Sequence, residues 1–265
     1  DSVVELIDNV DLKNAPWTPI EGFAGTFDGK DFTISNLTIA GDSLGDKVGL
    51  FATTGGGVMI RNLKFDNVSI TATGSDYVGT IVGLPTTADN TTMISNIAIT
   101  GSVNIHGKKY TGAFIGQMGC VGVCDLSVDG GDKATSTIQT DGKQAGGIVG
   151  TSVSGSGGYR VFLYNCSAKN LTITGPEQLG GLVGRGFIQM SLINCSVENV
   201  DVIGTKTVDP QTAAAFIGEV YNAYGVERFV FNCTATDVTT KNGEDTTYRE
   251  FAGPAMTVTA VGSGV

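Results

Sequence analysis

The feature that most constrains this chain is a short glycine-rich motif that recurs along most of its length. The clearest copy, LGGLVG, spans residues 179–184, and related copies start at residues 48, 78, 111, 145, 179 and 213. Their start-to-start spacings are therefore 30, 33, 34, 34 and 34 residues. A fixed period of this size is typical of repeat proteins, in which no unit can bury its own apolar face and neighbouring units must stack. The 265 residues are accordingly predicted to form one elongated body.

The composition indicates short strands and excludes two classes of partner. Thr, Val, Ile and Ser dominate the periodic segments and only 6 residues are Pro, which favours strands over helices. The net charge of −10 argues against nucleic acid, which is bound by clustered Lys and Arg, and the Lys108-Lys109 pair is the only cluster found. No apolar run reaches the roughly 18 residues that a membrane span needs. Any export signal or anchor is expected to lie outside this sequence.

A second recurring unit predicts corners in the chain. In each copy a large apolar residue stands two places before an Asn, while the next apolar residues stand one and three places after it, as with Ile34, Leu37 and Ile39 around Asn36. A straight strand alternates with period 2, so the chain must bend at the Asn to keep these residues on one face. Asn tolerates the left-handed backbone of such a corner, and its amide can bond to the next copy in a ladder. The predicted ladder consists of Asn36, Asn62, Asn96, Asn165, Asn194 and Asn232, with Asp125 in an equivalent position.

The same phase slip recurs a few residues later, around Asn67, Asn170, Asn199 and Asp237. Each repeat then holds three strands: a glycine-rich one, an Asn-Leu/Cys one and an Asn-Val-x-Ile one. The sequence thus predicts an all-β, right-handed parallel β-helix with three strands per coil and about seven coils. Residues 1–33 are predicted to cap one end and residues 34–238 to form the repeats. Residues 239–265 are predicted to form a degenerate last coil or cap and the start of a linker.

These motifs allow a resemblance to be stated. The Gly-Gly-Leu-Val-Gly type motif followed by Ile-x-Asn-Cys resembles the GLUG motif, and the leader from Trp17 to Leu37 resembles the segment that commonly precedes such repeats. The resemblance covers roughly residues 3–238. It implies a β-helical, noncatalytic, surface-exposed segment of a large exported bacterial protein, of the kind often described as adhesin-like. Similar repeats occur in some bacterial immunoglobulin-cleaving metallopeptidases, outside the catalytic part. Three copies depart locally, at Thr53, Asp125 and residues 213–215.

Two columns of the glycine-rich strand are apolar. The first, predicted to lie in the core, contains Phe51, Ile81, Phe114, Ile148, Leu182 and Phe216. The second contains Val82, Ile115, Val149, Val183 and Ile217, although these residues should point the other way. Two explanations stand: the strand turns a corner here, or the column is an exposed aliphatic stripe that docks another domain or protomer.

The cysteines and the single histidine do not predict a metal site. Cys166, Cys195 and Cys233 occupy equivalent places in consecutive repeats and are predicted to be buried free thiols. Cys120 and Cys124, four residues apart, are the better candidates for a disulfide. His106 has no Cys at ligand spacing, no acidic spacing recurs as in a calcium-binding solenoid, and no cofactor is predicted.

Function is predicted only coarsely. Tyr159, Glu219, Tyr221, Tyr224, Glu227 and Arg228 form a candidate loop site for a sugar or peptide, although the favoured explanation is that their rings cover loop backbone and the end of the core. The leading hypothesis is a noncatalytic extracellular module at the bacterial surface, a stalk or adhesin-like segment that contacts glycan, host matrix protein or other domains of its parent chain. The alternative is a polysaccharide-active lyase or hydrolase, but catalysis needs paired acidic residues that the strands do not supply. An ice-binding face is disfavoured because the Thr-x-Thr pairs do not recur in register.

Overall fold

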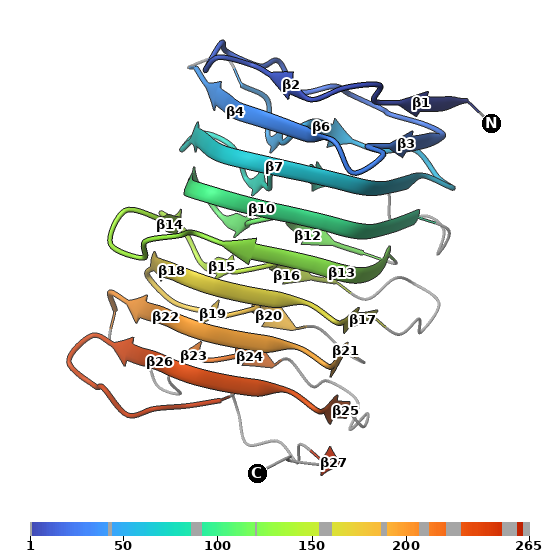
Figure 1. Ribbon diagram of the computed structural model, residues 1–265. Helices are drawn as coiled ribbons and strands as arrows, with labels where there is room; N and C mark the ends of the chain where they lie inside the picture. The colour runs from blue at the N-terminus through green and yellow to red at the C-terminus, as the bar shows by residue number, and fades with distance from the viewer. Residues whose placement is uncertain are drawn as a thin grey trace.

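The fold is built of strands stacked in chain order, with the N-terminus at one end and the C-terminus at the other (Figure 1). The computed structural model describes residues 2–41, 44–85, 92–119, 121–153, 161–186, 190–206, 212–220, 229–250 and 259–261. None of these residues is helical. Accordingly, no helical segment in the described part of the chain has the length and apolarity that crossing a lipid bilayer demands.

Three sheets of parallel strands make up the described chain. Sheet 1 has 15 described strands: β1 (Val3–Glu5), β2 (Val10–Asp11), β3 (Thr26–Asp28), β4 (Thr33–Ala40), β7 (Met59–Ala72), β10 (Thr92–Gly107), β13 (Val121–Asp129), β14 (Thr137–Thr140), β17 (Val161–Tyr164), β18 (Ser167–Gly175), β21 (Met190–Ile193), β22 (Ser196–Gly204), β25 (Phe229–Phe231), β26 (Thr234–Asn242) and β27 (Thr259–Val261). Sheet 2 contains β5 (Lys47–Val48), β8 (Tyr77–Val78), β11 (Tyr110–Gly112), β15 (Gln144–Gly146), β19 (Leu179–Gly180) and β23 (Ala213–Ala214). Sheet 3 contains β6 (Phe51–Thr53), β9 (Val82–Leu84), β12 (Ile115–Met118), β16 (Val149–Ser152), β20 (Val183–Gly186) and β24 (Ile217–Val220).

Equivalent positions of successive repeats pair directly with one another. Ile94 lies opposite Ile60 on one side and Val123 on the other, and the glycine-rich strands pair in the same way, as in Val149 opposite Val183. All pairings between named strands are parallel within the described residues. The architecture is therefore all-β and resembles a parallel β-helix, in which each coil lies on the preceding one.

The predicted corners have the left-handed backbone that the phase slip requires. The Asn and Asp residues at these corners have φ between 51° and 60°. They are Asn36, Asn62, Asn67, Asn96, Asp125, Asn165, Asn170, Asn194, Asn199, Asn232 and Asp237. Hydrogen bonding continues on both sides of each Asn, so the corner is a bend within sheet 1. In β7 and β10 one strand runs through it.

One member of the predicted ladder lies in a different column. Leu37 pairs with Val68, so Asn36 stacks on Asn67, whose Nδ2 donates to Asn36 Oδ1 at 3.4 Å. The prediction that Asn36 lines up with Asn62 is therefore wrong. In the preceding coil, the register position opposite Asn62 is occupied by Gly29, because Asp28 pairs with Arg61. The two kinds of corner have the same flanking pattern, and only the pairing register separates them.

The glycine-rich stretch contains the turn between sheets 2 and 3. Gly181 lies in this turn, and a Cβ built there would lie only 2.0 Å from the carbonyl oxygen of Ala215. Since no side chain fits, glycine is required where the backbone of one coil crosses so close to the next. The column from Val82 to Ile217 follows this turn and is at most 2% exposed, so the corner is correct and the exposed stripe is wrong. The preceding column, from Phe51 to Phe216, is at most 3% exposed and lies in the core as predicted. Its first member was assigned wrongly, however, because Phe51 pairs with Val82 and therefore belongs to the second column.

The N-terminal end of the stack leaves part of the core open to solvent. Residues 2–23 lie over the first full repeat through β1, β2 and isolated bridges at Ile20 and Phe23. Several apolar side chains of this layer are exposed, including Val4 at 45% and Ile7 at 91%. An apolar cavity of about 150 Å³ opens here. It is lined by Leu6, Val10, Leu12, Trp17, Ile20, Phe27, Ile34, Leu50 and Phe51.

Candidate functional site

The predicted loop cluster is represented in the structure by Glu219 alone. Tyr159, Tyr221, Tyr224, Glu227 and Arg228 lie outside the described residues. Glu219 stands on β24 opposite Arg185 of β20, and its Oε2 lies 3.6 Å from Arg185 Nε. The two side chains are only 16% and 26% exposed, so the ion pair is partly shielded from water. Sequence reasoning missed Arg185, although it stands 34 residues before Glu219, at the same place in its repeat.

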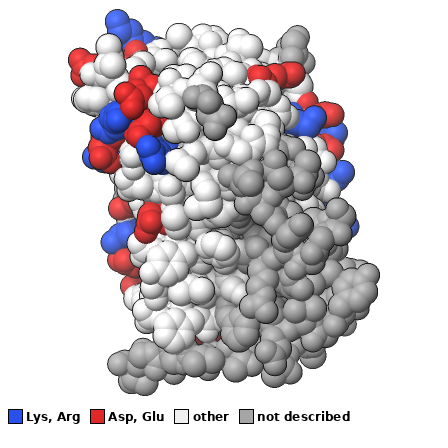
Figure 2. Space-filling model, turned by 90° about the vertical axis from the view of Figure 1, so that its right-hand side faces the viewer, with Lys and Arg blue, Asp and Glu red and all other residues white. Residues whose placement is uncertain are grey.

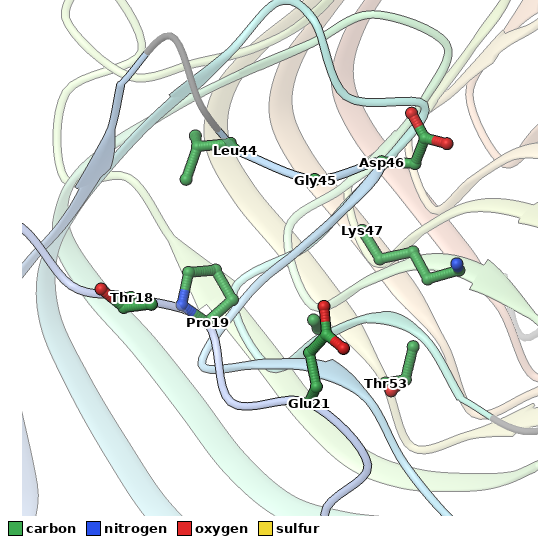
Figure 3. Close-up of a pocket in the computed structure, with 9 residues that line it drawn as sticks. Thr18, Pro19, Glu21, Leu44, Gly45, Asp46, Lys47 and Thr53 are labelled. Atoms are coloured by element: carbon green, nitrogen blue, oxygen red, sulfur yellow. The ribbon is translucent and has the colours of Figure 1, made fainter.

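A shallow cavity of about 240 Å³ lies between the first coils (Figure 3). Its walls come from the segment before β3, the segment leading into β5, and β6. The lining residues are Thr18, Pro19, Glu21, Leu44, Gly45, Asp46, Lys47, Ala52 and Thr53. In Figure 3 the Glu21 carboxylate extends into the space bounded by Pro19, Leu44 and Lys47. The cavity is smaller than the roughly 300–1,000 Å³ of typical ligand sites, so it suits a small polar group.

The most buried described carboxylate, Asp28, is held by partners from the next coil. Its Oδ2 lies 3.0 Å from Arg61 Nε, its Oδ1 accepts from Asn62 Nδ2 at 3.0 Å, and the side chain is 3% exposed. Burial alone would raise the pKa of Asp28, but hydrogen bonds from the Lys30 backbone N–H, Asn62 and Arg61 leave that pKa below its ordinary value. Asp28 therefore stays ionised at neutral pH, cannot act as a general acid there, and links neighbouring coils.

A similar arrangement fixes Asp76. Its carboxylate oxygens lie 3.1 Å from Lys108 Nζ and 3.4 Å from Lys109 Nζ. Burial opposes ionisation of Asp76, but the two ammonium groups outweigh it and lower the pKa. The Lys108-Lys109 pair is thereby neutralised in part by a carboxylate of the preceding repeat.

The stacked cysteines Cys166, Cys195 and Cys233 are free thiols, and Cys124 lies in another column, opposite Tyr164. Cys124, Cys166, Cys195 and Cys233 are free; Cys166 and Cys195 are buried and Cys233 is partly buried. The hydrogen bond with Cys166, together with burial, raises the pKa of Cys195 to about 12, so its nucleophilic thiolate is scarce at neutral pH. Cys120 lies outside the described residues. Within the described ranges no group of three His, Cys, Asp or Glu side chains has the geometry to hold a metal ion.

An exposed aromatic column is the site that sequence reasoning overlooked. Tyr164 of β17 lies opposite Ile193 of β21, which lies opposite Phe231 of β25. Tyr164 is 42% exposed and Phe231 is 45% exposed, with Ile193 partly exposed between them. Phe162, two residues before Tyr164, is also 40% exposed. We call Tyr164, Ile193 and Phe231 the aromatic column. The sequence pattern that could have revealed this column is the residue directly before each corner Asn. That residue is aromatic or aliphatic in the last three copies.

The charges on this end of the sheets are distributed unevenly. Figure 2, which views the right-hand side of Figure 1, shows charged atoms over the upper, N-terminal coils. The described surface of the lower coils in the same view is mostly uncharged. Strands β17, β21 and β25, which contain the aromatic column, lie in the lower, C-terminal half of the stack in Figure 1.

Comparison with known proteins supports the architecture more strongly than it supports any activity. No family model matches the sequence. A stretch of 99 residues is 39% identical to halomucin of Haloquadratum walsbyi (strain DSM 16790 / HBSQ001). It covers 37% of this chain but only 1% of halomucin. The fold is similar to the crystal structure of a candidate immunoglobulin A1 protease from Bacteroides ovatus, with a TM-score of 0.61 over 95% of this chain and 75% of that chain. At 17% identity this likeness shows the fold alone.

Proposed function

We propose that this chain is a noncatalytic module of an exported bacterial surface protein, in which it serves as a stalk or adhesin-like binding segment. The observation that carries the proposal is the way its charged groups are used. Ion pairs such as Asp28–Arg61 and Lys169–Glu198 join neighbouring coils, at 3.0 and 2.8 Å. Charges committed to such links join coil to coil and leave fewer carboxylates available for proton transfer.

The finer architecture forms part of the proposal. We take the fold to be a right-handed β-helix with three strands per coil and about seven coils, belonging to the GLUG-type repeat proteins. Right-handed winding is the rule for parallel crossover connections. A filled core excludes a channel or an internal site, so contact with glycan, host matrix protein or neighbouring domains would involve the outer faces and loops.

The comparisons are consistent with an extracellular location. Halomucin is by its name a mucin, and mucins act outside the cell. The matched stretch is a very small part of halomucin. We therefore propose that this chain is likewise a segment of a much longer protein. The activity in the name of the Bacteroides ovatus protein is not carried over to this chain.

Location can be tested on intact cells that produce the protein. We expect an antibody against residues 92–119 to label unbroken cells, and an added protease to remove the signal. Labelling that requires lysis, with the protein recovered from the cytoplasmic fraction, would contradict an extracellular module. A cytoplasmic marker protein serves as the control for cell integrity.

One observation favours the alternative of a polysaccharide-active enzyme: Glu21 and Asp46 line the same cavity, with Lys47 beside them. Two carboxylates near one ligand are the minimum for glycosidic cleavage. We expect no product from neutral and acidic polysaccharides incubated with the purified chain. Turnover that disappears in both Glu21→Gln and Asp46→Asn, but survives in Thr18→Ala, would establish the enzyme instead.

A further inference from the structure

The aromatic column runs beside a ladder of corner amides. Each of its residues immediately precedes a corner Asn, so Tyr164, Ile193 and Phe231 are followed by Asn165, Asn194 and Asn232. Parallel strands lie about 4.8 Å apart, which places Tyr164 and Phe231 roughly 10 Å apart along the stack. The result is a narrow apolar strip with hydrogen-bonding groups along one edge.

The amide ladder is interrupted beside this strip. Asn232 Nδ2 donates to Asn194 Oδ1 at 2.9 Å, and Asn165 Nδ2 donates to Asp125 Oδ1 at 2.6 Å. Among the described residues, however, no hydrogen bond joins Asn194 Nδ2 to Asn165 Oδ1. The two coils are not separated at this point, because the Asn165 backbone N–H donates to the Ile193 carbonyl at 2.9 Å. An amide donor and an amide acceptor are therefore open on adjacent strands, next to the exposed ring of Tyr164.

We propose that the aromatic column binds a linear, neutral oligosaccharide, with sugar rings stacked on Tyr164 and Phe231 and a hydroxyl group seated between Asn165 and Asn194. A hydroxyl group both donates and accepts, so one group can satisfy Asn165 Oδ1 and Asn194 Nδ2 together. The inference rests on the proposed extracellular function and names the class of ligand for it.

The shape and charge of the surface favour a neutral sugar chain over other ligands. The column lies on an open strand face, which suits an extended ligand that is held along its length. The net charge of −10 opposes a polyanionic glycan. A stable protein partner would need about 800 Å² on each side, far more than this narrow strip of side chains offers. Aromatic rings provide large rigid contact areas whose ordering costs little entropy.

Calorimetric titration of the purified chain tests the stacking contacts. The probes are hexasaccharides of β-linked glucose, xylose, mannose and N-acetylglucosamine, with hexagalacturonate as the acidic probe. We expect at least one neutral probe to bind, and Tyr164→Ala and Phe231→Ala each to weaken that binding roughly tenfold. Ile7→Ala, which removes a more exposed apolar side chain at the other end, should leave affinity unchanged. Melting curves of all three variants establish that each is folded.

The amide contact has its own conservative test. Asn194→Asp keeps the acceptor for Asn232 but removes the open donor, and Asp125 in the equivalent corner demonstrates that Asp fits this backbone, with φ of 56°. We expect affinity to fall at least threefold. Ser95→Asp, which adds the same charge next to the corner Asn96 in the N-terminal half, should have no effect on affinity.

Four outcomes would overturn the inference. They are the absence of saturable binding to every neutral probe at 10 mM, binding to hexagalacturonate alone, affinity unchanged in both aromatic variants, and light scattering that reveals self-association lost in Tyr164→Ala. The last would make the column a contact between copies of this chain. A protein that labels on intact cells but binds no sugar would refute this inference and leave the proposed function standing.

Discussion

The outward column of sheet 1 differs between the two halves of the molecule. In the N-terminal half it contains Asp28, Arg61 and Ser95 on β3, β7 and β10, whereas in the C-terminal half it contains Tyr164, Ile193 and Phe231. The inward residues beside these two sets stay apolar throughout, as with Ile60 and Leu163, both fully buried. The fold therefore constrains the inner face of each strand to apolar residues. The outer face differs between the halves: it contains a coil-linking ion pair in the N-terminal half and an exposed apolar strip in the C-terminal half.

The largest expected effect tests the shared interior. Leu163→Ala on β17 and Ile94→Ala on β10 should each lower the free energy of unfolding by about 2–5 kcal/mol, because both delete buried methyl groups at equivalent positions. Urea denaturation followed by circular dichroism measures the change. A loss below about 1 kcal/mol in either variant would show that the two halves do not share one closely packed core.

A smaller effect should separate the two halves at the corner amides. Asn62→Ala loses a bond to Asp28 and another from Asn96, and forces a left-handed backbone on Ala, for an expected loss of about 2–4 kcal/mol. Asn194→Ala loses only the bond from Asn232 and should cost roughly 1 kcal/mol less. Asn62→Gly, which tolerates the backbone, is the control and should recover about 1–2 kcal/mol. Equal losses in the two Ala variants would contradict the difference described here.

Acid should weaken the N-terminal half through Asp28. Its pKa is lower in the folded state than the value near 3.9 of an unfolded chain, so its contribution to stability is complete above that value. The contribution is lost as the pH falls through the lower folded-state pKa. Asp28→Asn should therefore flatten the acid limb of the stability curve between about pH 5 and 2. An unchanged acid limb, measured by urea denaturation at each pH, would refute the assignment to Asp28.

The smallest effect on stability is expected in the aromatic column. Tyr164→Ala removes an exposed ring and should change the free energy of unfolding by no more than about 0.5 kcal/mol, even though sugar binding falls. The adjacent Leu163→Ala provides the contrast, one residue away on the opposite face of the same strand. A loss above about 1.5 kcal/mol for Tyr164→Ala would mean that the ring supports the fold.

Much of the fold could be predicted from the sequence because its signals are local and repeated. The phase slip at each Asn predicts a left-handed corner, and all of the Asn and Asp residues assigned to corners have one. The column from Ile81 to Phe216 is buried as predicted, and its large side chains follow glycine or alanine at a nearly constant spacing.

What escaped prediction depends on the register between coils. Asn36 has the same flanking pattern as Asn62, yet its neighbour in space is Asn67, because Asp28 and Gly29 occupy the preceding corner. The pairing of Arg185 with Glu219, by contrast, follows from the 34-residue period and could have been predicted. The residues of the aromatic column can be found in the sequence, because each directly precedes a corner Asn. Their exposure could not be predicted without knowing which face of the strand they lie on. Of the predicted loop cluster, only Glu219 lies in the described residues.

In the isolated 265-residue chain, the open apolar cavity at the N-terminal end lies where we expect the stack to come apart first. In a structure whose layers touch only their neighbours, an outermost layer is held from one side alone. Strands β1 (Val3–Glu5) and β2 (Val10–Asp11) form this outermost layer, and the Ile7 side chain between them is almost fully exposed to solvent. Unfolding of the isolated chain should therefore begin at β1 and β2 and proceed from there to the following coils. Backbone amide protons of β1 and β2 should exchange with solvent sooner than those of β7 or β10.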